Sequence, residues 1–128
     1  MKNIIKYLVK KGESVTWDEV MVYDKNNLEG ETEIRAVVED GGTLKLKGKI
    51  LIQKDAVHAN AFLRFKVLLL GKTARAEVDP ELEILTNDVK ASHAASVGRV
   101  DEEQLFYLMS RGFDRQKAIE LIVEAFLI

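Results

Sequence analysis

The chain has 128 residues, 47% of them hydrophobic, which is enough for one buried core, so we expect a single folded domain with at most a small appendage. Its 19 basic and 21 acidic residues are interspersed and give a net charge of -2, which excludes the strongly basic face that nucleic acid or an anionic membrane would need. The absence of cysteine excludes disulfides, thiolate zinc sites, cysteine nucleophiles and any iron–sulfur cluster held by this chain's own thiolates, and it fits a cytoplasmic location.

The N-terminal stretch MKNIIKYLVKKG is too short, and too interrupted by lysine, to be a signal peptide or a membrane span. We therefore expect no membrane partner. Apolar residues recur in this stretch at helical spacing, and Lys11-Gly12 can end a helix. The apolar positions are Ile4, Ile5, Leu8 and Val9. The pattern predicts a short amphipathic helix at the N-terminus.

From Val15 to Val89 the pattern changes to short apolar runs separated by residues that favour turns, which predicts strand after strand with no helix between them. An antiparallel sandwich or barrel and a parallel solenoid both remain open. The solenoid is favoured because several runs are only three or four residues long and Asp40-Gly41 is the one candidate for a two-residue hairpin turn. No repeat of fixed period is visible, which argues against the six-residue coils of acyltransferases.

After Gly98 the apolar spacing becomes helical, and two helix starts are clearly marked. Asp101 is a good N-cap with Gln104 as its capping-box partner, and Asp114 repeats the cap after Gly112, which suits a helix C-terminus. The residues that follow predict a helical hairpin with a wide apolar stripe, which we expect to cover the end of the solenoid.

A series of motifs in the second half of the chain resembles the C-terminal part of the SufB/SufD proteins, scaffold subunits of the SUF machinery for iron–sulfur cluster assembly, and is closer to SufD. The matching segments are Pro80–Ile84, Asp88–Lys90, Ser92-His93, Val97-Gly98, Asp101-Glu102, Gln104–Leu108, Ser110–Gly112 and Ala118. The resemblance implies a right-handed parallel β-helix followed by a C-terminal helical segment. Because family members are much longer, we expect residues 1–30 to be an N-terminal segment that could cap the solenoid, residues 31–98 a truncated β-helix, and residues 99–128 the hairpin.

The same resemblance directs attention to His93. In SufD-like members the position of Ala91 is usually a cysteine, and this cysteine and the histidine lie at the subunit interface where a nascent cluster is proposed to assemble. Alanine cannot bind iron, so His93 would be a single ligand in a transient cluster shared with a partner, and this chain alone would bind no cofactor. The plainer interpretation, which we prefer, is that His93 packs at a coil end. We interpret His58 as a surface or turn residue.

We expect no catalytic residue and no enzyme activity, because the acidic clusters near Asp101 and Glu81 are better explained as helix-start charges and exposed strand positions. The resemblance implies instead that the hairpin binds SufC, an ABC-type ATPase. The candidate contacts are Leu105, Phe106, Tyr107, Met109 and Phe113. It also implies pairing through the coils of Leu82 to Val97, with a SufB-like subunit or with a second copy as a homodimer. Two alternatives remain open: a small metal-binding or enzymatic protein centred on His93, and a paralogue outside SUF that serves as an interaction module.

Overall fold

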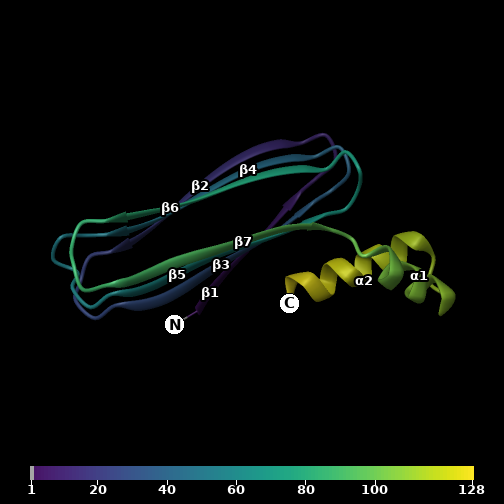
Figure 1. Cartoon of the computed structure of the whole chain (residues 1–128). Coiled ribbons are helices and arrows are strands. Elements are labelled where there is room, and N and C mark those ends of the chain that lie inside the picture. The colour runs from purple at the N-terminus through teal and green to yellow at the C-terminus, as the bar shows by residue number, and fades with distance from the viewer. Residues whose placement is uncertain (1) are drawn as a thin grey trace.

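The computed structural model describes residues 2–128, which form seven strands followed by two helices. The strands are β1 (Lys2–Val9), β2 (Ser14–Tyr23), β3 (Glu29–Val38), β4 (Thr43–Ile52), β5 (Asn60–Leu69), β6 (Arg75–Ile84) and β7 (Lys90–Arg99). The odd-numbered strands form one parallel sheet in the order β1-β3-β5-β7, and the even-numbered strands form a second in the order β2-β4-β6. The chain therefore winds alternately through two layers, which lie face to face in Figure 1. The predicted short parallel solenoid with a C-terminal helical pair is confirmed.

The coils of the solenoid stack in register, although the sequence shows no fixed period. Each strand pairs with the strand that comes second after it in the chain, so that one coil consists of one strand from each sheet and the loops between them. Lys2 of β1 pairs with Glu31 of β3, whereas Thr43 of β4 pairs with Arg75 of β6, and the second pair is further apart along the chain than the first. Because the loops differ in length from coil to coil, the strands keep their register while the sequence period is lost.

The main core lies between the two sheets and is filled by alternate residues of each strand, as period-two patterning requires. Phe65 is fully buried there, and its ring occupies the space over Gly48 in the opposite sheet. A Cβ at residue 48 would lie 2.5 Å from Phe65 Cζ. Glycine is required at this position because the two sheets meet around a large aromatic ring.

One corner of the solenoid is built from three residues with left-handed backbone conformation, Asn27, His58 and Asp88, with φ of 61°, 61° and 58°. His58 Nε2 lies 2.6 Å from Asp88 Oδ2. His58 is thus an exposed turn residue, as predicted. At another turn, the amide and hydroxyl of Thr73 donate hydrogen bonds to Asp40. These two hydrogen bonds lower the pKa of the Asp40 carboxyl below its usual value.

The N-terminal prediction is wrong, because residues 2–9 form β1 and not a helix. The parallel register of β1 with β3 places Ile5, Tyr7 and Val9 against the core, an alternation that the helical spacing had obscured. The division expected at residue 30 falls inside β3, and residues 2–30 extend both sheets by one strand each. Every strand from β2 to β7 has ten residues, which is longer than the apolar runs suggested.

The two helices are α1 (Glu102–Ser110) and α2 (Arg115–Leu127), and both predicted caps are confirmed. Asp101 accepts a hydrogen bond from the Glu103 amide, and Asp114 accepts one from the Lys117 amide. A second hydrophobic cluster, separate from the main core, joins the hairpin to the outer face of the four-stranded sheet. Its buried members are Val37, Leu68, Leu105, Ala118 and Ile122. The hairpin therefore covers the side of that sheet, and the expectation that it would cover the end of the solenoid is wrong.

Candidate functional site

The last coil of the solenoid ends in an open apolar rim. Strands β6 and β7 are the terminal strands of their sheets, so within residues 2–128 no further coil covers the side chains that they direct towards the core. Leu82 and Ile84 are 38% and 41% exposed, whereas Ile50 and Ile52, which pair with them one coil earlier, are 1% and 0% exposed. Val97 of β7 and Leu85 after β6 are also exposed. We call Leu82, Ile84, Leu85 and Val97 the rim.

His93 lies on β7 and its side chain is exposed at this open end. It pairs in register with Leu63, a fully buried core residue, so it belongs to the row that faces the interior of the solenoid. Ala91 lies on the same face of the strand, about 7 Å away, and packs partly against the core. Ala91, at the position where the resemblance implies a cysteine, and His93 therefore lie on one face of β7.

The exposed side of α1 carries large apolar residues. Phe106 is 75% exposed, and Tyr107, Met109 and Phe113 are also exposed. Phe106 and Met109 are three residues apart, so they share one side of α1, and Phe113 follows the helix after the turn at Gly112. The Arg111 guanidinium lies 5.1 Å from the centre of the Tyr107 ring and stacks over it. We call Phe106, Tyr107, Met109 and Phe113 the α1 stripe.

Leu105 does not belong to this exposed set, although it was predicted from the sequence to contact a partner. It is 1% exposed and packs in the second cluster against the sheet and α2. Its side chain holds the hairpin on the solenoid and is not available to a partner, so the prediction for this residue is corrected to a structural role.

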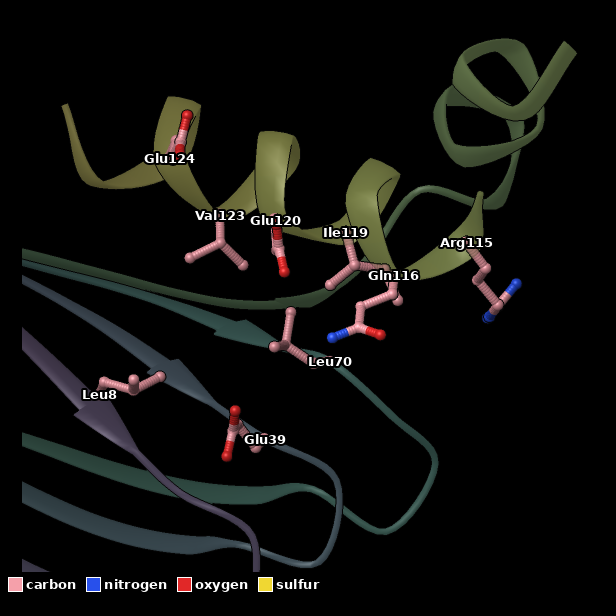
Figure 2. A pocket seen from close by; sticks show the side chains of 9 residues that line it. All are labelled: Leu8, Glu39, Leu70, Arg115, Gln116, Ile119, Glu120, Val123 and Glu124. Atoms are coloured by element: carbon pink, nitrogen blue, oxygen red, sulfur yellow. The ribbon is translucent and has the colours of Figure 1, made fainter. Parts of the chain in front are cut away.

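A groove between α2 and the four-stranded sheet was not foreseen from the sequence. It has a volume of about 670 Å³, and Figure 2 shows α2 above it and the ends of the strands below. Its apolar lining residues are Leu8, Leu70, Ile119 and Val123, and its polar ones are Glu39, Arg115, Gln116, Glu120 and Glu124. Nothing local in the sequence indicates this groove, because one side is formed by residues at the ends of β1, β3 and β5 and the other by the last helix of the chain.

A buried carboxylate on the outer face of the same sheet was also missed. Glu33 is 2% exposed, and Arg35, Lys2 and Arg64 form ion pairs with it. Burial disfavours the charged form, but the hydrogen bond from Arg35 and the positive charges of Arg35, Lys66 and Lys2 outweigh this effect and lower the pKa of Glu33. These cations come from three neighbouring strands, which is why the arrangement cannot be recognised along the chain.

Within residues 2–128, no group of three or more metal-ligating side chains is placed to hold an ion. Neither α1 nor α2 is long and apolar enough to span a membrane.

The two parallel sheets and the C-terminal helical pair define the class of this protein, a short parallel solenoid with exposed apolar residues at its open end and on α1. The model of one such family, described as the SUF system FeS cluster assembly, SufBD core domain, matches residues 3–126, and the chain belongs to this family. It is 41% identical over 92 residues to the iron-sulfur cluster assembly protein SufD of Escherichia coli strain K12, covering 72% of this chain and 22% of that protein. The resemblance to the SufB/SufD family is confirmed.

Two further relatives agree with this assignment. The iron-sulfur cluster assembly protein SufD of Bacillus subtilis strain 168 is 44% identical over 91 residues, which cover 71% of this chain and 21% of that protein. An iron-sulfur cluster assembly SufBD family protein of Pyrococcus horikoshii is 39% identical over 93 residues, covering 73% of this chain and 20% of that protein. The chain therefore spans about a fifth of the length of these relatives.

Proposed function

We propose that this chain acts in iron–sulfur cluster assembly as a SufD-like scaffold or accessory protein of the cytoplasm, which works by binding other proteins and catalyses no reaction. Membership of the SufBD family supports the assembly role. The observation that carries the binding mechanism is the exposure of two apolar surfaces, the rim and the α1 stripe. Large apolar patches of this kind usually mark interaction sites.

The rim is the proposed site of self-association, or of pairing with a SufB-like subunit. Burying it would cover Leu82, Ile84 and Val97 and would hide the unpaired edges of β6 and β7, which are otherwise available to another chain. Light scattering should give a dimer for the native chain and a monomer for Val97→Asp. The matched control is Val20→Asp, a similarly exposed valine on the outer face of the other sheet, which should leave the dimer intact. A native chain that stays monomeric at high concentration contradicts this proposal.

The α1 stripe is the proposed contact for a SufC-like ABC ATPase. Aromatic side chains are common anchors in protein interfaces, and Phe106 and Tyr107 are exposed where a partner could bury them. Co-purification with the ATPase should be lost in Phe106→Glu and in Tyr107→Glu. The control is Val22→Glu, which adds the same charge at an exposed position of β2 in the other sheet. If the stripe variants stay folded by circular dichroism and still bind the ATPase, the contact lies elsewhere.

His93 is the proposed point at which this chain could touch a nascent cluster that it shares with a partner. With alanine at residue 91, the histidine would supply one ligand and the partner the others. Anaerobic addition of iron and sulfide to the native chain alone should give no stoichiometric cluster, and His93→Ala should behave in the same way. Stoichiometric binding that is lost in His93→Ala would instead favour the alternative of a small metal-handling protein.

A further inference from the structure

We infer that the groove between α2 and the four-stranded sheet is a docking site for an extended, basic and apolar segment of a partner protein. This surface is separate from both the rim and the α1 stripe, because it shares no residue with either and is lined by α2 and the strand ends. The inference follows from the size of the groove and from its charge.

The apolar part of the groove has a floor and a roof. Leu8, near the end of β1, and Leu70, just after β5, form the floor, and Ile119 and Val123, one helical turn apart, form the roof (Figure 2). The hairpin does not close this space, because its fully buried contacts with the sheet are made by other residues of the two helices. Apolar side chains of a partner would be covered on two sides here.

The length of the groove suits a short extended segment. Its lining follows α2 from Arg115 to Glu124, over which the helix rises about 14 Å. About four residues of an extended chain span this length, and alternate residues would direct two apolar side chains towards the apolar lining.

The charge of the groove selects a basic segment. Glu39, Glu120 and Glu124 line it, against one cation, Arg115. Arg115 lies 3.7 Å from Glu102 of α1, so its charge is already offset. Lysine or arginine beside the apolar residues of the partner would bring counter-charges to the three carboxylates of the groove.

The carboxylates of the groove have few cationic partners of their own. Glu39 accepts a hydrogen bond from the Lys11 amide, and Glu120 forms an exposed ion pair with Lys117 at 3.8 Å. Within residues 2–128, neither Glu39 nor Glu124 lies in an ion pair. Binding of a basic segment would therefore break few of the ion pairs that the chain already makes.

The experiment is an NMR titration of the isotope-labelled full chain with the blocked pentapeptide Lys-Leu-Lys-Leu-Lys, and separately with Glu-Leu-Glu-Leu-Glu. We expect saturable shifts of the amides of Leu70, Ile119 and Val123 with the lysine peptide only. The double variant Glu120→Lys and Glu124→Lys should weaken binding at least tenfold. The matched control, Glu77→Lys with Glu83→Lys, makes the same change of net charge on the outer face of β6 and should bind as the native chain does.

A second variant tests the apolar half of the argument. Leu8→Ser removes part of the floor at a residue that is already 42% exposed, so the fold should survive, and peptide binding should weaken several-fold. Val22→Ser, at a similar exposure outside the groove, is its control. Equal binding of the glutamate peptide, shifts that map away from the groove, or no saturation at millimolar concentration would each overturn the inference.

Discussion

Replacing Leu105 by alanine should release the helical hairpin while leaving the solenoid intact. Leu105 is fully buried in the cluster that joins α1 and α2 to the sheet, and this cluster is separate from the core between the sheets. Removal of a fully buried leucine side chain costs about 2–5 kcal/mol. The whole cost should fall on the docking of the hairpin, because Leu105 is not part of the main core.

Native-state hydrogen exchange measures this cost residue by residue. A loss of about 2–5 kcal/mol corresponds to exchange of the α1 and α2 amides that is faster by roughly 30-fold to 5,000-fold, up to the limit set by the docking free energy itself. The amides of Ile50 and Phe65, in the core between the sheets, should keep their native rates. Phe106→Ala is the matched control, because the neighbouring side chain is larger but 75% exposed, and its effect should stay within about 0.5 kcal/mol.

Two results would refute this reasoning. If the amides of Ile50 and Phe65 accelerate as much as those of the hairpin, then the two clusters unfold as one cooperative unit. If Leu105→Ala and Phe106→Ala have the same small effect, the burial of Leu105 does not hold the hairpin on the sheet. In the expected case, the variant also separates docking of the hairpin from partner binding, since the α1 stripe is untouched.

Three further predictions concern the solenoid. Gly48→Ala should destabilise the folded chain by about 1–3 kcal/mol, because the added methyl group overpacks the core against Phe65. Phe65→Leu in the same background should recover part of that loss in thermal unfolding. If the effects of the two substitutions on stability simply add, the packing described is contradicted. The pKa of Glu33 is lowered in the folded chain, so its contribution to the free energy of unfolding is present above the unfolded pKa of about 4.3 and is lost as the pH falls through the folded pKa. Glu33→Gln should therefore flatten the acid side of the plot of stability against pH. An unchanged plot would count against the ion pairs. Thr73→Val removes the hydroxyl donor and should raise the pKa of Asp40 in a carbon-detected NMR titration, while an unaltered titration would mean that the hydroxyl hydrogen bond is unimportant.

The prediction for the N-terminus failed for a physical reason. Residues 4, 5, 8 and 9 satisfy a helical spacing, but residues 5, 7 and 9 equally satisfy the alternation of a strand, and so short a segment cannot separate the two periods. A helix of this length is marginal by itself. The hydrogen bonds that β1 makes with β3 decide the outcome, and these depend on a strand that begins only at Glu29.

Among the candidate interaction residues, the sequence could not separate exposed from buried positions. Leu105 and Phe106 are adjacent and both apolar, yet one is buried and the other is the most exposed aromatic residue of α1. The difference depends on which face of α1 meets the sheet, and that is fixed by the contact with Val37 and Leu68. His93 lies within β7 and is exposed, so the interpretation that it packs at a coil end is wrong, and its place in the inward row needed the register with β5.

The sequence by itself determined the local features of this protein. The caps Asp101 and Asp114, the turn residues and the series of SufD-like motifs act within a few residues of one another, so they established the helical hairpin and the family. The tertiary structure decided which residues are exposed and which are buried. It exposes the rim, the outward face of α1 and the groove under α2, and it buries Glu33. Exposure depends on which strands and helices cover a residue, and in a solenoid those neighbours come from other coils, which are distant in the sequence.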